Sequence, residues 1–194
     1  MNEELKNKFF SNNRLSVYDN LKHYELNLTL SKDYYILLAV LEVSLRNSIS
    51  IYFEENIGLE WMESDFLNIN SKRRIKEITN KFSKNNNINN DKIISELSFG
   101  FWTALFRKDY ATTMRTKTIK AIFPNLPNQK IKFIDRNYIN KKLNHIRVFR
   151  NRVFHYEKII NNSEFINIKD DILEILEYFD TDIKKFAIRV NQDV

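Results

Sequence analysis

Cysteine is absent from the 194-residue chain. This absence excludes a disulfide framework, a thiol nucleophile and a cysteine-ligated zinc site, and it is typical of proteins in a reducing compartment. The first ten residues, MNEELKNKFF, lack the apolar stretch of a signal peptide, and no uninterrupted run approaches the length of a membrane span. We therefore expect a cytoplasmic protein with no membrane-spanning segment.

Glycine and proline are scarce as well, with two of each in the chain. A β-sandwich or barrel needs frequent turns, and these are the residues that most often supply them. Gly58 and Gly100, the two glycines, cannot form a Walker or dinucleotide-binding loop, because each of these loops requires several closely spaced glycines. The composition predicts an all-α fold and excludes both of these nucleotide-binding classes.

Histidine is the third rare residue. His23, His145 and His155 form no HExxH pair and no cluster at metal-ligand spacing. Metal-dependent hydrolysis is therefore poorly supported, and we expect neither a metal nor an organic cofactor. A lone histidine on a helix is more often a surface residue or a hydrogen-bonded core residue than a catalyst.

The length and the hydrophobic content of 43% suit one good core and are short for two domains. We expect a single helical bundle with N-terminal helices (residues 1–57), a variable middle (58–127) and the motif-bearing and closing helices (128–194). Trp102 is predicted to lie in the core. Caps, helix breakers and apolar periodicity place helices at residues 12–25, 31–56, 71–84, 91–106, 129 or 130 to 156, and 164–190. Loops are expected at 27–30 and 85–90, and a short helical turn at 61–66. Helices are expected to stop at Gly58, Pro124 and Pro127.

The net charge of +6 is unevenly distributed along the chain. Residues 107–152 contain 13 lysines and arginines against two acids. A basic block of this kind is typical of proteins that bind phosphate backbones, although a solvated helical surface and an acidic protein partner are alternatives. The residues expected to contact such a backbone are Lys72, Arg73, Arg74, Lys76, Lys141, Lys142 and Arg152.

The basic block runs into the sequence RNRVFHYE at residues 150–157. On a helix, Arg147, Asn151 and His155 would form one polar stripe, because they are spaced four residues apart, and Arg150 would flank it. Cleaving a phosphodiester without a metal requires a group that exchanges protons near neutral pH and a cation that stabilises the phosphorane. Histidine and arginine supply these parts, so the candidate catalytic residues are His155, Arg150 and the orienting amide of Asn151.

Three polar residues, Glu42, Arg46 and Asn47, interrupt the strongly apolar helix predicted at 31–56. Glu42 and Arg46 stand four residues apart in the favourable acid-first order, so one interpretation is a salt bridge along the helix. The other is that they face the Arg150–His155 stripe, because charges on a buried helix must be paired or functional. In that case Glu42, Arg46, Asn47 and Arg147 form a shell that supports the motif.

The pattern R-N-x-x-x-H at the end of a helical domain, here Arg150 to His155, resembles the signature of the HEPN ribonucleases. The stretches LEVSLRN at 41–47, SFGFW at 98–102 and IRVFRNR at 146–152 narrow this resemblance to the Abi-like group of bacterial abortive-infection proteins. Together they span most of the chain. The resemblance implies a HEPN-type helical bundle with metal-independent endoribonuclease activity, whose site is carried by the two long helices at 31–56 and 130–156.

One motif supplies one histidine, so the acid and the base cannot both be His155 of a single subunit. This favours a composite site built from two copies, a homodimer, which the family resemblance also implies. HEPN toxins that are silenced by nucleotidylation have a tyrosine at the second position after the histidine. Here Tyr156 occupies the first position and Glu157 the second, so the chain departs from the pattern on which that modification depends.

Two other functions fit the same residues. A HEPN scaffold without catalytic activity would hold a structured RNA on the basic surface, and an interaction module would dock an acidic protein. An unrestrained ribonuclease would be toxic to its own cell. The expected regulatory partner is therefore a bound RNA, an antitoxin or a phage-derived trigger.

Overall fold

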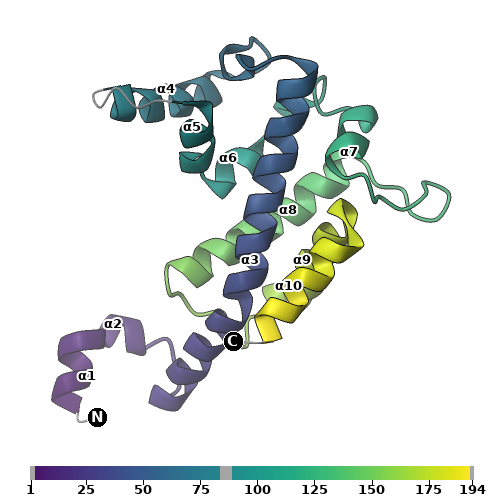
Figure 1. Cartoon of the computed structure of the whole chain (residues 1–194). Helices are drawn as coiled ribbons and strands as arrows, with labels where there is room; N and C mark the ends of the chain where they lie inside the picture. Colours follow the sequence, from purple (N-terminus) through teal and green to yellow (C-terminus); the bar gives the residue numbers. More distant parts are fainter. Residues whose placement is uncertain (1–2, 84–88, 193–194) are drawn as a thin grey trace.

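The computed structural model describes residues 3–83 and 89–192, and all regular elements in these ranges are helical (Figure 1). The all-α prediction is confirmed. Three short 3₁₀ turns span Trp61–Glu63, Lys108–Tyr110 and Ser163–Phe165. The α-helices are α1 (Glu3–Phe10), α2 (Asn12–Leu15), α3 (Leu21–Asn56), α4 (Ile69–Ser83), α5 (Asn90–Glu96), α6 (Phe99–Ala104), α7 (Thr116–Ile122), α8 (Arg136–Phe154), α9 (Ile168–Phe179) and α10 (Thr181–Gln192).

Helix α3 is the centre of the bundle. Its 36 residues extend over about 54 Å, and it contacts α6, α7, α8, α9 and α10 (Figure 1). Asn20 caps its first turn, because the Asn20 side chain accepts a hydrogen bond from the backbone N–H of His23 at 2.9 Å. The helix ends before Gly58, whose φ of 115° is a left-handed conformation that glycine adopts without strain. The stop predicted at Gly58 is confirmed.

The core forms around the buried side of α3, where apolar residues recur every three or four positions. Trp102 on α6 is fully buried, as predicted, and its indole N–H donates to the Leu97 carbonyl at 3.1 Å. Among the residues that the structure describes, α3 alone has the length and composition to cross a membrane, but here it packs at the centre of the bundle. Its fully buried apolar residues are Leu37, Leu38, Leu41, Leu45, Ile49 and Phe53.

The connection predicted at residues 27–30 is wrong, because α3 begins at Leu21 and continues through this segment without a break. Asparagine favours turns, which is why Asn27 is expected in a loop from the sequence. In the structure Asn27 is fully buried, and its side-chain oxygen accepts hydrogen bonds from the N–H groups of Ile159 and Ile160. The helix predicted at 12–25 is replaced by the short helix α2 and the start of α3.

Two predicted helices are each divided by a capping side chain. The helix expected at 91–106 breaks at Leu97, after which the Ser98 hydroxyl accepts a hydrogen bond from the Phe101 N–H and begins α6. The helix expected at 164–190 breaks at Asp180, whose carboxylate accepts a hydrogen bond from the Asp182 N–H in the first turn of α10. Apolar residues continue across both breaks, so their periodicity predicted single helices.

Helix α8 is shorter than predicted at both ends. The carboxylate of Asp135 caps its first turn by accepting a hydrogen bond from the Tyr138 N–H at 2.7 Å, so the helix begins at Arg136 and not at residue 129 or 130. Its last residue is Phe154, not Tyr156.

The remaining predicted bounds agree more closely. Helix α4 corresponds to the helix predicted at 71–84, and α7 ends at Ile122, just before Pro124 and Pro127. The turn predicted at 61–66 contains the 3₁₀ turn at Trp61–Glu63. Of the loop predicted at 85–90, residues 85–88 lie outside the described residues, whereas the side chain of Asn89 caps α5.

Candidate active site

The motif lies at the C-terminal end of α8, and His155 is the capping residue beyond the helix rather than part of it. The His155 N–H donates to the Asn151 carbonyl at 2.9 Å, so the two residues still follow one another by one turn, as the spacing predicted. Tyr156 has a φ of 57°, which ends the helix and turns the chain. The imidazole of His155 is exposed and has no hydrogen-bond partner among the described residues. It is available for proton transfer.

Arg150 is held by two neighbours. One guanidinium N–H donates to the carboxylate of Glu42 on α3 at 3.1 Å, and the guanidinium carbon lies 4.1 Å from the centre of the Phe154 ring. The side chains of Arg150 and Glu42 are each 24% exposed, so the pair is shielded from water more than a surface salt bridge is. Glu42 therefore pairs across the helices with the motif, as the second sequence interpretation expected.

The rest of the predicted supporting shell does not converge on Arg150. The Arg46 guanidinium donates to the amide oxygen of its neighbour Asn47 at 3.1 Å. The Arg147 guanidinium donates to the side chain of Asn144, also on α8, at 2.8 Å. A Cβ added at Gly100 would lie 3.8 Å from the Cδ atom of Arg147, so the SFGFW stretch on α6 packs beside Arg147.

Asn27 anchors the segment that follows the motif, and sequence reasoning did not assign it to the site. Its amide donates to the Glu157 carbonyl at 3.2 Å, and its oxygen accepts from the N–H groups of Ile159 at 2.8 Å and Ile160 at 3.0 Å. Asn27 thereby satisfies three backbone groups from one buried position. One sequence signal could have identified Asn27. It is a polar residue at a position where the helical periodicity predicts a buried side chain.

The N-terminal segment is attached to the same part of the chain by two cations. Arg14 donates to the Tyr156 carbonyl at 2.6 Å, and Lys158 donates to the Val17 carbonyl at 2.7 Å. Since carbonyl groups are neutral acceptors, these bonds leave the charges of both cations uncompensated.

The residues expected to contact RNA are divided between two regions. Helix α4 carries Lys72, Arg73, Arg74 and Lys76, and Figure 1 shows it near the C-terminal end of α3, apart from the C-terminal end of α8. On α4, Lys72 pairs with Asp65 at 2.9 Å and Arg74 with Glu77 at 3.1 Å, and these exposed ion pairs are weak. Arg152 lies near the motif and pairs with Glu157 at 3.4 Å. The structure does not bring α4 to the motif.

Lys141 and Lys142 on α8 have different environments. Lys141 is exposed, whereas Lys142 is ion-paired with Asp171 and Glu174 of α9. Burial alone would lower the pKa of Lys142, but its hydrogen bonds to the two carboxylates outweigh burial and raise the pKa. Because its charge is compensated within the chain, Lys142 has less charge to offer a phosphate than the exposed Lys141 has.

Helices α8 and α9 are joined by a cluster of charged and polar groups around Glu174. Burial opposes ionisation of Glu174, but hydrogen bonds from Lys132, Lys142 and Tyr178 outweigh it and lower its pKa to about 2. Tyr138 also donates to Glu174, at 3.0 Å. His145 contacts the carboxylate of Asp171 with one ring nitrogen and the Glu164 carbonyl with the other, both at 2.8 Å. His145 is therefore a structural histidine.

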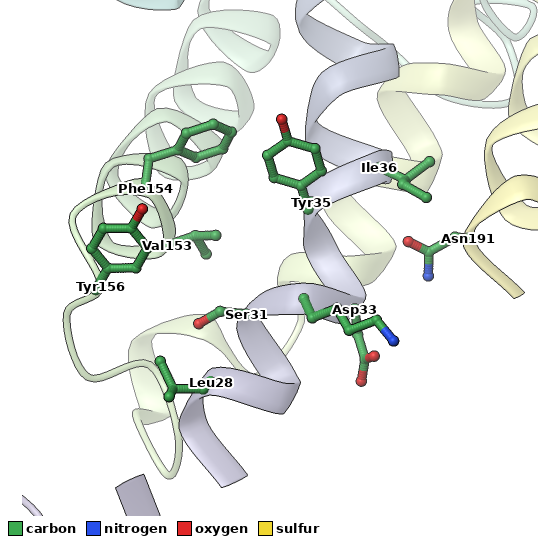
Figure 2. Close-up of a pocket in the computed structure, with 10 residues that line it drawn as sticks. Leu28, Ser31, Asp33, Tyr35, Ile36, Val153, Phe154, Tyr156 and Asn191 are labelled. Atoms are coloured by element: carbon green, nitrogen blue, oxygen red, sulfur yellow. The ribbon is translucent and has the colours of Figure 1, made fainter. Parts of the chain in front are cut away.

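Two cavities adjoin the end of α8. The first is an apolar groove of about 570 Å³ between α3 and α8, lined by Tyr35, Phe154 and Tyr156 among others (Figure 2). The second, of about 560 Å³, is lined by polar and charged residues, including Arg14, Arg152 and Lys158. Tyr156 lines both cavities. Among the residues that the structure describes, no three histidine or acidic side chains are grouped so that they would hold a metal ion.

Comparisons with protein-family models, curated proteins and solved structures found no match to this chain.

Proposed function

We propose that this protein is a metal-independent endoribonuclease of the HEPN, abortive-infection type, which acts in the cytoplasm as a homodimer. The observation that supports this most is the arrangement around the motif. Glu42 and Phe154 hold the guanidinium of Arg150, and the imidazole of His155, five residues later, is exposed and unpartnered among the described residues. An oriented cation and an available proton-transfer group are the two parts that cleavage without a metal requires.

In the proposed reaction the 2′-hydroxyl of the substrate attacks the adjacent phosphorus. His155 exchanges a proton with the attacking or the leaving oxygen, Arg150 stabilises the charge of the phosphorane, and Asn151 orients the imidazole or the phosphate. The bond from phosphorus to the 5′-oxygen breaks, which leaves a 2′,3′-cyclic phosphate and a 5′-hydroxyl. Because each copy contributes one such histidine, the second proton transfer uses the motif of the partner copy.

The experiment compares wild type with Arg150→Ala and His155→Ala on transfer RNA and messenger RNA in the presence of EDTA. We expect wild-type cleavage to persist in EDTA, and each substitution to lower its rate at least about 100-fold, the range for losing a general acid or base. His145→Gln removes an imidazole from the same helix outside the motif and should retain activity. Loss of cleavage in EDTA, or full activity of a folded His155→Ala variant, would contradict the mechanism.

One observation favours a second candidate, a non-catalytic RNA-binding scaffold of the same fold. The charge of Arg150 is already compensated by Glu42 within the chain, as in a purely structural ion pair. The same purified proteins separate the two functions, because a scaffold would bring RNA through purification and leave it intact in both wild type and His155→Ala.

Regulation is part of the proposal, because this activity must be restrained in its own cell. Lys72, Arg73, Arg74 and Lys76 on α4 lie apart from the motif, so they are not needed to hold the scissile phosphate. We assign them to a bound RNA that restrains or directs the nuclease. An antitoxin or a phage-derived trigger would act on the same assembly.

A further inference from the structure

The two cavities beside the motif have complementary chemistry and share one residue. Tyr156 lines the apolar groove on one side and the charged cavity on the other, its side chain is 62% exposed, and it directly follows His155. A ligand bound across Tyr156 would therefore have an apolar part in the groove, a charged part in the second cavity, and its junction next to His155.

The groove offers flat aromatic surfaces. The rings of Tyr35 and Phe154 are stacked with their centres 5.5 Å apart and their planes at 28°, and Arg150 packs against Phe154. Tyr35 is nevertheless 56% exposed, so the stack leaves ring surface open to a ligand. Figure 2 shows Tyr35 opposite Phe154 and Tyr156. Stacking on such rings is the usual way in which proteins bind unpaired bases, because each base has a π-face.

Polar groups lie at the other end of the groove. Asp33 and Asn191 line it together with Ile36, on the side of α3 away from the aromatic rings (Figure 2). These groups leave one end of the groove polar, whereas the aromatic rings at its other end offer the flat surface on which a nucleobase stacks.

The second cavity is positively charged. Arg14, Arg152 and Lys158 line it together with one carboxylate, that of Glu157. Arg152 pairs with this carboxylate, but Arg14 and Lys158 donate to backbone carbonyls, which do not neutralise them. Two positive charges remain at the cavity, and a phosphate group would complement them.

We propose that the groove and the cavity form one nucleotide subsite for single-stranded RNA, with the base in the groove and its phosphate in the cavity. The identity of the ligand as RNA rests on the proposed function. The subsite would fix the strand beside the motif, so that the neighbouring phosphodiester reaches His155 and Arg150. Because stacking does not distinguish bases strongly, the subsite would accept any of the four bases.

The first experiment measures binding separately from cleavage. A fluorescent six-nucleotide RNA is titrated onto His155→Ala protein, with and without Tyr35→Leu, and folding is checked by circular dichroism and thermal unfolding. We expect Tyr35→Leu to weaken binding about 5- to 100-fold without changing the dependence on salt, because it removes stacking and no charge. Ile51→Ala changes an equally exposed residue of α3 outside the groove, and should bind as the parent does.

The second experiment tests the cavity. Arg14→Gln combined with Lys158→Gln should lower the slope of log affinity against log salt by about 0.7, since the cavity holds one phosphate and each neutralised phosphate contributes about 0.7 for single strands. Lys185→Gln, an exposed lysine of α10, is the matched control and should leave the slope unchanged.

Three results would overturn the subsite. The first is a folded Tyr35→Leu variant that binds RNA as tightly as its parent does. The second is a loss of affinity in Tyr35→Leu that is as large for an abasic oligomer as for RNA. The third is binding to phosphatidylglycerol vesicles that is stronger than binding to RNA. Cleavage by the wild type is scored independently. If RNA binding depends on Tyr35 but the wild type cleaves no RNA, the subsite is supported and the nuclease function is contradicted. If the wild type cleaves RNA but binding does not depend on Tyr35, the nuclease function is supported and the subsite is contradicted.

Discussion

Asn27 joins two parts of the chain that are at least 130 residues apart in sequence. Its amide group forms three hydrogen bonds with the backbone of residues 157–160. Without each of these bonds, a polar backbone group near the core would be poorly paired. The segment that begins with His155 is therefore positioned from α3 as well as from α8.

Replacing Asn27 by alanine should be strongly destabilising, because it leaves two N–H groups and a carbonyl without partners. We expect the free energy of unfolding to fall by about 2–4 kcal/mol, measured by urea denaturation. Thr29→Ala, which removes an exposed hydroxyl two residues along the same helix, should change it by less than about 0.5 kcal/mol. Equal effects of the two substitutions would mean that the Asn27 bonds contribute little.

Glu42 sets the orientation of Arg150, and this can be separated from stability. Glu42→Gln keeps a hydrogen-bond acceptor near Arg150 but removes the charge, so the guanidinium is held less firmly. We expect about a tenfold fall in kcat for RNA cleavage with little change in KM, and a loss of about 1 kcal/mol in stability. Glu55→Gln, an exposed carboxylate on α3, is the control. A change in KM alone would place Glu42 in substrate binding instead.

The seam between α8 and α9 makes the fold sensitive to acid. Glu174 has a pKa of about 2 in the folded protein, against an ordinary value of 4.5. A carboxyl group whose pKa is lowered by folding stabilises the protein above its unfolded pKa, and this contribution is lost as the pH falls toward the folded pKa.

We therefore expect Glu174 to contribute of order 2 kcal/mol of stability near neutral pH, most of which is lost between about pH 5 and pH 2.5. Urea denaturation across this range should show a steep fall in wild-type stability and a flatter curve for Glu174→Gln. Asp170→Asn, an exposed carboxylate on α9, should keep the wild-type slope. Parallel curves for wild type and Glu174→Gln would contradict the assignment.

Helices with strong local signals were predictable, whereas those that depend on distant partners were not. The apolar residues of α3 and the left-handed Gly58 act within a few residues, so the centre and the end of that helix followed from the sequence. The start of α3 did not, because Asn27 finds its partners beyond residue 156. The breaks before α6 and at Asp180 depend on single capping side chains within a continuous apolar pattern.

The candidate site shows the same division. Spacing along one helix predicted that Asn151 and His155 follow each other by one turn, and the hydrogen bond between them agrees. Spacing could not decide whether Glu42 pairs with Arg46 or with Arg150, because that depends on how α3 crosses α8. The two cavities are formed by segments distant in sequence and left no local signal.

At the scale of the whole molecule, the proposed composite site would require two copies of the chain. Val43 is 45% exposed on α3 next to Glu42, so we expect it to be a contact in the proposed two-fold interface, together with Arg46 and Arg147. Val43→Arg should weaken the dimer at least about tenfold, because it buries a charge in that interface. Light scattering over a range of concentrations measures this, with Leu59→Arg as the exposed control. A wild-type monomer that cleaves RNA would exclude the composite site.

The basic surface of α4 predicts salt-dependent binding of a longer, structured RNA. Reversing the charges of Arg73, Arg74 and Lys76 should lower the slope of log affinity against log salt by about one unit for each phosphate that these side chains neutralise. The measurement is filter binding between about 50 and 200 mM salt, and co-purifying RNA should persist in His155→Ala. Weak RNA binding whose affinity does not change with salt concentration would instead indicate an acidic protein partner or a solvated surface.

The central position of α3 has a consequence for synthesis of the chain. Its partners α8, α9 and α10 lie between residues 136 and 192, so most of its apolar side has nothing to pack against while the ribosome makes the intervening segments. The nascent protein therefore exposes the apolar side of a long helix for most of its translation. Exposed apolar surface of this kind promotes aggregation and attracts chaperones, so the yield of folded protein should depend on how quickly the last three helices emerge.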